Sequence, residues 1–141
     1  MGLGICCRGG GLKLMNLNLR RLPDSLSICK LPAGTPVPAW ATQGNFWSIT
    51  RTPDELSIVC ESARIPADLA SNHPGWRALM VQGPLDFSLT GILSALAAPL
   101  AAAGISIFAV STFDSDYLLV KETDFERAIA TLQSSGHAVL N

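Results

Sequence analysis

The sequence is poor in the residues that build most metal centres and catalytic sites. It has two histidines and four cysteines, and no two cysteines are spaced as C-x-x-C. Because zinc sites rely on such closely spaced ligands, we expect no metal ion and no cofactor. No Ser/His/Asp set and no Gly-rich phosphate loop is recognisable either, so we do not expect an enzyme. The cysteines are best interpreted as free thiols of a reducing, cytoplasmic compartment.

Charge is also scarce. Charged residues make up 15% of the chain and the net charge is −1, which gives no reason to expect nucleic acid or an anionic membrane as a partner. The run from Phe87 to Phe113 has no charged residue at all and is long enough to span a bilayer. Pro99 and Gly104 interrupt it, however, and acids rather than basic residues flank it. We therefore expect no membrane span, and the start of the chain lacks the apolar core of a secretory signal.

The second half of the chain shows alternating and helical hydrophobic periods in a definite order. Three strands are predicted at 76–82, 105–111 and 116–121, a helix at 89–103, a second helix from Thr123 that ends at Gly136, and a last strand at 137–140. The order β-α-β-β-α-β is that of a ferredoxin-like α+β fold. Such a fold has a four-stranded antiparallel sheet with two helices on one face.

The predicted helix at 89–103 is apolar on every side. Leu89, Ile92, Leu93, Leu96, Leu100 and Ala103 share one face, and the opposite face carries alanines without any charge. A helix of this kind is buried on two sides. The sheet of its own domain accounts for one side, and another element or a second subunit is expected on the other.

The first half is a shorter version of the same pattern. It predicts strands at 12–22, 25–31, 46–50 and 56–61, a helical turn at 38–41 and a covering loop at 62–75. Residues 47–61 (WSITRTPDELSIVCE) are similar to residues 108–122 (FAVSTFDSDYLLVKE), which indicates an internal repeat that lacks its last helix and strand. We expect a truncated half at 1–74 and a complete domain at 75–141. Residues 1–13 are either disordered or precede a true start at Met15.

Two stretches resemble a known family: GPLDFSLTGIL (83–93) and AGISIFAVSTFDSDYLLV (103–120). They are similar to ACT domains, and more narrowly to small bacterial tandem-ACT proteins related to aspartate kinase regulatory domains and to the CASTOR arginine sensors. The likeness is strong over residues 76–127 and weaker over 14–75. It implies a regulatory protein that binds an amino acid without catalysis, at sites where two ACT units pack side by side. The uncharged face of the helix at 89–103 predicts that the protein is a homodimer.

The resemblance also implies which residues contact the ligand. They lie at the loop-to-helix join and in the second-strand hairpin: Asp86, Phe87, Ser88, Leu89, Thr90, Gly91, Ile92, Ser111, Thr112, Phe113, Asp114 and Asp116. Many ACT domains have Pro-Gly at the join, whereas this chain has Thr90-Gly91. The first half lacks the Gly-bearing join, so no matching site is expected there.

The chemistry of these residue types suits an α-amino acid. A ligand carboxylate fits the backbone N–H groups and the positive dipole of a helix N-terminus, and Gly91 permits close approach. The acids Asp86, Asp114 and Asp116 are candidates for binding the ammonium group. Two structural interpretations stay open: Asp86 or Ser88 caps the helix, and Asp114 forms only an Asx turn. The leading hypothesis is an amino-acid sensor, and the alternative is a ligand-free ACT dimerisation or interaction module.

Overall fold

The computed structural model describes residues 16–82 and 91–141 and divides the chain into two compact units. Residues 23–77 form the N-terminal unit, and residues up to 22 join residues 78–141 in the C-terminal unit. This differs from the predicted contiguous division into 1–74 and 75–141. The reason is that the strand before residue 22 pairs with strands of the second half of the chain. Local periodicity predicts a strand but cannot predict a pairing partner that is distant in the sequence.

The C-terminal unit has the predicted βαββαβ order. Its elements are β2 (Asn18–Arg21), β6 (Asn72–Val81, which begins in the N-terminal unit), α2 (Ile92–Ala102), β7 (Phe108–Ser111), β8 (Asp116–Lys121), the 3₁₀ helix η3 (Glu122–Asp124), α3 (Phe125–Ser134) and β9 (Ala138–Leu140). Omitting β2, the series from β6 to β9 confirms the ferredoxin-like fold class.

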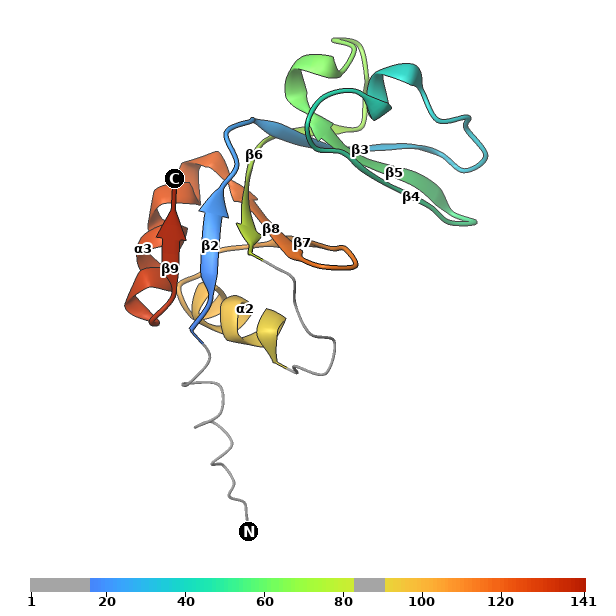
Figure 1. Ribbon diagram of the computed structural model, residues 1–141. Coiled ribbons are helices and arrows are strands. Elements are labelled where there is room, and N and C mark those ends of the chain that lie inside the picture. Colours follow the sequence, from blue (N-terminus) through green and yellow to red (C-terminus); the bar gives the residue numbers. More distant parts are fainter. Residues whose placement is uncertain (1–15, 83–90) are drawn as a thin grey trace. The chain divides into compact units, whose positions relative to one another are not determined.

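The sheet of this unit contains one strand more than predicted. The strand order is β7-β8-β6-β2-β9. The sheet therefore has five strands instead of the predicted four, and β2 is the additional strand. Figure 1 shows β2 between β9 and β6. Leu19 lies opposite Val81 in an antiparallel ladder and opposite Val139 in a parallel ladder. Because Leu19 is fully buried, the inserted strand contributes to the core as well as to the hydrogen-bond ladder.

Both helices of the C-terminal unit pack in one hydrophobic core with the strands. The strands supply residues two apart, such as Leu79 with Val81 and Leu118 with Val120, as expected for one face of a sheet. The helix α3 buries the predicted set Phe125, Ala128, Ile129 and Leu132. The helical period read from the sequence therefore identified the correct face of α3.

The helix α2 is buried on only one side in the described residues. Ile92, Leu96 and Leu100 are buried, whereas Leu93 is 38% exposed. The outer side also exposes Ser94, Ala98, Ala101 and Ala102. Among residues 16–82 and 91–141, nothing covers the second side of α2, so the described part of the chain does not meet the prediction of burial on two sides and leaves an uncharged helical face exposed.

The N-terminal unit has the same topology with shorter helical pieces. Its elements are β3 (Leu26–Pro32), the 3₁₀ helix η1 (Ala39–Thr42), β4 (Ser48–Arg51), β5 (Glu55–Glu61), the 3₁₀ helix η2 (Ser62–Arg64) and the start of β6. The sheet order is β4-β5-β3-β6. Two expectations are wrong here: residues 72–75 are not part of a loop, and the last strand is not missing. The start of β6 supplies that strand, since Asn72 pairs with Cys29 and Trp76 with Leu26.

The internal repeat has an offset of 60 residues, not the 61 of the sequence comparison. Residues 48–51 of β4 correspond to residues 108–111 of β7, and η2 (62–64) corresponds to η3 (122–124). At the hairpin turns, Thr52 donates its N–H to the Glu55 carbonyl and Thr112 donates to the Ser115 carbonyl. The repeat is thus anchored by a Thr-x-Asp turn in each unit.

Candidate functional site

Seven of the twelve predicted ligand-binding residues lie in the described part of the chain. They are Gly91, Ile92, Ser111, Thr112, Phe113, Asp114 and Asp116. The other five, Asp86, Phe87, Ser88, Leu89 and Thr90, lie outside the described residues and stay predictions. The described residues come from two places, the start of α2 and the β7–β8 hairpin.

Gly91 is the N-cap residue that precedes α2, and it adopts a left-handed backbone with φ 83° and ψ 4°. The Gly91 carbonyl accepts the Ala95 N–H at 2.7 Å, the first bond of the helix. Glycine has no side chain to cap the first turn, so that turn receives no hydrogen bond from an N-cap side chain. The Ile92 side chain is only 7% exposed and belongs to the core. The Ile92 side chain is therefore accounted for by packing.

The β7–β8 hairpin is held by hydroxyl groups. Thr112 Oγ1 donates to the Ser115 carbonyl at 3.1 Å, and Ser111 Oγ donates to the Asp116 carboxylate at 2.6 Å. Ser115 Oγ donates to the Val81 carbonyl at 2.5 Å. This last bond fixes the turn to the end of β6, immediately before segment 83–90. The sequence-based set of site residues missed Ser115; the Thr-x-x-Ser spacing across a turn was the available signal.

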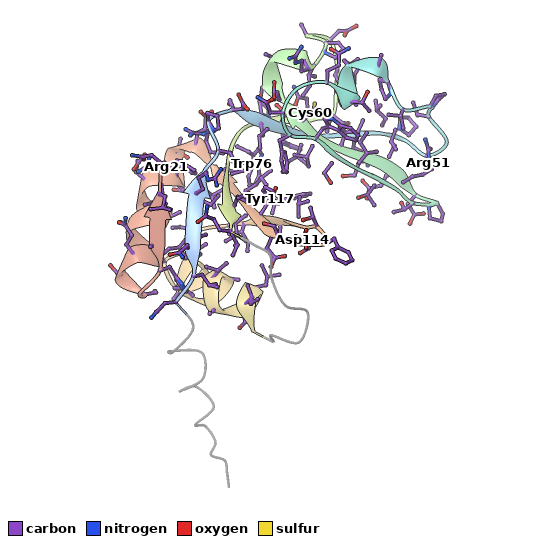
Figure 2. The ribbon with its side chains drawn as sticks, viewed as in Figure 1. Arg21, Arg51, Cys60, Trp76, Asp114 and Tyr117 are labelled. Atoms are coloured by element: carbon purple, nitrogen blue, oxygen red, sulfur yellow. The ribbon has the colours of Figure 1, made fainter. Side chains whose placement is uncertain are left out.

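The tip of the hairpin presents an aromatic ring and an acid to solvent. Phe113 is 78% exposed, so it neither lines a pocket nor joins the core in the described structure. Figure 2 shows Asp114 at the end of the hairpin, and no hydrogen bond or ion pair links it to another described residue. Asp116 is bonded to Ser111. The structure thus joins Ser111 with Asp116, but it does not link the hairpin to Gly91 by any hydrogen bond among the described residues.

The described cysteines do not form a reactive or metal-binding site. Cys29 and Cys60 are 2% and 0% exposed in the core of the N-terminal unit. Burial, with the neighbouring Cys60, raises the pKa of Cys29 from 9.0 to about 11. Burial, with the neighbouring Glu61, raises the pKa of Cys60 to the same value, about 11. Within residues 16–82 and 91–141, no three His, Cys, Asp or Glu side chains are grouped as metal ligands.

A sequence model of the ACT domain matches residues 71–134, and a second model, for an N-terminal domain, matches residues 24–68. Residues 71–134 of this chain therefore belong to the ACT domain family. An X-ray structure of a protein from Agrobacterium tumefaciens is 47% identical, with a TM-score of 0.85, over 89% of this chain and 93% of that one.

Two further proteins are similar to this chain, one in sequence and one in fold. The human protein named cytosolic arginine sensor for mTORC1 subunit 1 is 36% identical over 95 residues, which cover 62% of this chain and 29% of the relative. The match therefore spans less than a third of that relative's length. The regulatory subunit of aspartate kinase from Thermus flavus shares the fold at a TM-score of 0.60 and 10% identity, over 86% of this chain and 99% of that one. Among the described helices, none combines the length and the hydropathy that a bilayer crossing requires.

Proposed function

We propose that this ACT protein is a non-catalytic regulatory module that binds an α-amino acid. The observation that carries the proposal is the start of α2, where Gly91 leaves the first turn without an N-cap side chain. Backbone N–H groups at a helix N-terminus, together with the helix dipole, form a ready site for a carboxylate. Because glycine has no Cβ, a ligand can approach this turn closely.

The hairpin supplies the complementary charge for the ammonium group of the ligand. Asp114 is exposed and has no hydrogen-bond or ion-pair partner among the described residues, so it can accept hydrogen bonds without breaking an existing contact. Asp116 already accepts a bond from Ser111, and a carboxylate can accept further donors. The bond from Ser115 to Val81 holds this turn against the strand that precedes the loop-to-helix join. The site residues Asp86 to Thr90 remain part of the proposal.

We infer that the first ligands to test are basic amino acids. The 36% identical human relative carries arginine in its name, and two acids in the candidate hairpin suit a guanidinium or a second ammonium group. Neutral and acidic amino acids serve as comparisons. The name of the same relative describes it as cytosolic, which supports a cytoplasmic location for this protein.

A thermal-shift panel of the twenty amino acids tests this function. A ligand at about a hundred times its dissociation constant stabilises the native state by roughly 2.7 kcal/mol. For a protein of this size we expect a rise in Tm of about 5 °C for one or two amino acids and none for the others. A flat panel at millimolar concentrations would contradict the sensor proposal for the purified protein.

The Asp114→Ala variant tests the hairpin, and the repeat offers a matched control. Asp54 occupies the equivalent exposed position in the Thr-x-Asp turn of the N-terminal unit, where no site is expected. The side chain of neither acid makes the hydrogen bonds of its turn. The Tm of each variant should therefore differ from that of the parent protein by only about 0.5 °C to 2 °C. Only Asp114→Ala should reduce the ligand-dependent shift. Equal ligand shifts in both variants would remove Asp114 from the site.

We propose a homodimer as the working assembly. The exposed face of α2, which includes Leu93 and Ala98, carries no charge along its whole length, and such a face is suited to close packing against a second copy. Sedimentation at micromolar concentration should give about twice the monomer mass. Substituting Ala98→Glu in the middle of this face should shift the protein to monomer, and a monomeric parent protein would contradict the proposal.

The alternative function is a ligand-free ACT module that serves only for dimerisation or protein interaction. The uncharged face of α2 is the observation that favours it, since this face needs no ligand to be buried. A flat amino-acid panel combined with a dimer in sedimentation would favour this alternative. In that case Asp114→Ala should change only the stability of the turn, and by a small amount.

A further inference from the structure

A buried histidine holds the start of the inserted strand β2. The side chain of His137 is 5% exposed, and its Nδ1 accepts the backbone N–H of Leu17 at 3.1 Å. The carbonyl of Leu17 accepts the N–H of Ala138 at 2.9 Å. Leu17 is therefore bound through both of its backbone groups, one residue before the parallel ladder of β2 with β9 begins at Asn18 and Ala138. The imidazole takes the place that a strand carbonyl would occupy in a longer ladder.

The position of His137 is fixed by the end of α3. The N–H of His137 donates to the Leu132 carbonyl at 3.1 Å, and the N–H of Gly136 donates to the Gln133 carbonyl at 3.0 Å. This pair of bonds, with Gly136 at φ 98°, is a Schellman motif. A Cβ on Gly136 would lie 2.9 Å from Asn16 Oδ1, so the turn and the residues before β2 are closely packed. The backbone of His137 therefore cannot move away from Leu17 without disturbing the helix end.

The observed hydrogen bond is available only to the neutral ring. A neutral imidazole has one N–H and one acceptor nitrogen, whereas both nitrogens of a protonated imidazole are donors. A proton on Nδ1 would face the Leu17 N–H, and the bond would be replaced by a repulsive contact between two donors. Histidine side chains commonly take up a proton between pH 5 and pH 8.

The elements packed around His137 provide few charges that could offset this effect. Residues 16–19, residues 128–136 and residues 138–140 contain no acidic or basic side chain. The charged groups on the same elements lie at their other ends: Arg20 and Arg21 on β2, and Glu126 and Arg127 in the first turn of α3. Arg21 pairs with Glu126 at 2.8 Å, and Arg127 pairs with Asp124 at 3.1 Å. No acid on these segments is therefore placed to bind a protonated His137.

We propose that His137 is a proton-sensitive latch for the start of β2. When the ring is neutral, residues 16–17 are bound to the turn after α3 and β2 is held in register between β9 and β6. When the ring is protonated, this end of β2 and the adjoining part of β9 open to solvent, while the buried Leu19 keeps the rest of β2 in the core.

Amide hydrogen exchange measured by NMR on the full chain tests the latch. Between pH 7.5 and pH 5, after correction for intrinsic exchange, the protection of the Leu17 amide should fall about five- to tenfold, the loss expected for one hydrogen bond. Amides of the buried strand β5 should keep their protection. Unchanged protection of Leu17 across this pH range would overturn the proposal.

Three variants separate protonation from packing. His137→Asn places a non-titrating Oδ1 near the position of Nδ1, so it should keep the Leu17 bond and lose the pH dependence. His137→Phe removes the acceptor and should leave Leu17 unprotected at every pH. His73→Gln changes the other, exposed histidine and should behave like the parent protein. The same acid-dependent loss in His137→Asn would overturn the proposal even if His137→Phe failed to fold.

Discussion

The free energy of unfolding should fall by about 4 kcal/mol between pH 9 and pH 11, because two buried thiols must stay protonated in the native state. Burial is the main cause that raises the pKa of Cys29 and of Cys60 to about 11, from 9.0. In the unfolded chain both thiols ionise near pH 9, so the unfolded state releases protons first as the pH rises. The stabilisation is thus present below pH 9 and is lost toward pH 11. Urea denaturation across this interval measures it.

The double variant Cys29→Ala/Cys60→Ala is the control for this alkaline effect. It should be less stable at pH 8, because it leaves small cavities beside Leu56 and Ile58. Its free energy of unfolding should nevertheless depend much less on pH between 9 and 11 than that of the parent protein. Identical slopes in the two proteins would show that lysine or tyrosine groups, rather than these thiols, cause the alkaline loss.

The prediction also bears on the reactivity of the thiols. A thiolate is the nucleophile in alkylation, and a buried thiol with a raised pKa is largely protonated at pH 8. Iodoacetamide should therefore leave Cys29 and Cys60 unmodified in the native protein and modify both in urea, as judged by mass spectrometry of their peptides. Rapid native modification of Cys60 would contradict the described burial.

Only part of the fold is encoded by local sequence patterns. The order from β6 to β9 could be predicted because each element has its own hydrophobic period, and the buried face of α3 follows from the spacing of Phe125, Ala128 and Ile129. The place of β2 could not be predicted. Its residues indicate a strand, but pairing with β6 and β9 joins segments some 60 and 120 residues apart, and no local pattern specifies such a partner.

The same distinction holds for the candidate site. The predicted strands at 105–111 and 116–121 indicate a hairpin between them, and the structure adds Ser115 as the residue that ties its turn to Val81. That bond spans 34 residues, so turn chemistry alone did not reveal it. The roles of Gly91, Asp114 and Asp116 in binding rest on the family resemblance and on the chemistry of an amino acid. They stay predictions until a ligand is measured.

The internal repeat leads to a matched pair of glycine substitutions with very different expected effects. Gly44 and Gly104 are equivalent at the 60-residue offset and have φ values of 95° and 76°. A Cβ on Gly104 would meet no atom within 4 Å. A Cβ on Gly44 would lie 2.5 Å from Cδ and Oε2 of Glu61. Both alanine variants therefore bear the cost of a left-handed backbone, about 1–2 kcal/mol, and only Gly44→Ala adds a collision.

The collision at Gly44 is costly because the Glu61 carboxylate is held in place. Its side chain is 12% exposed, it accepts the Asn45 N–H at 2.6 Å, and it lies 3.5 Å from the Nε of Arg64. Moving the carboxylate aside breaks a hydrogen bond to a charged group, which contributes about 1.5–3 kcal/mol. We therefore expect Gly44→Ala to lose about 3–4 kcal/mol of unfolding free energy and Gly104→Ala to lose about 1–2 kcal/mol.

A double-mutant cycle with Glu61→Ala isolates this contact. Glu61→Ala alone should destabilise the protein, because the loop before β4 loses its anchor at Asn45. In that background Gly44→Ala should cost no more than Gly104→Ala costs in the parent protein, since the colliding atoms are gone. If Gly44→Ala and Gly104→Ala cost the same in the parent protein, the Glu61 carboxylate moves aside without loss, and it does not hold the loop before β4.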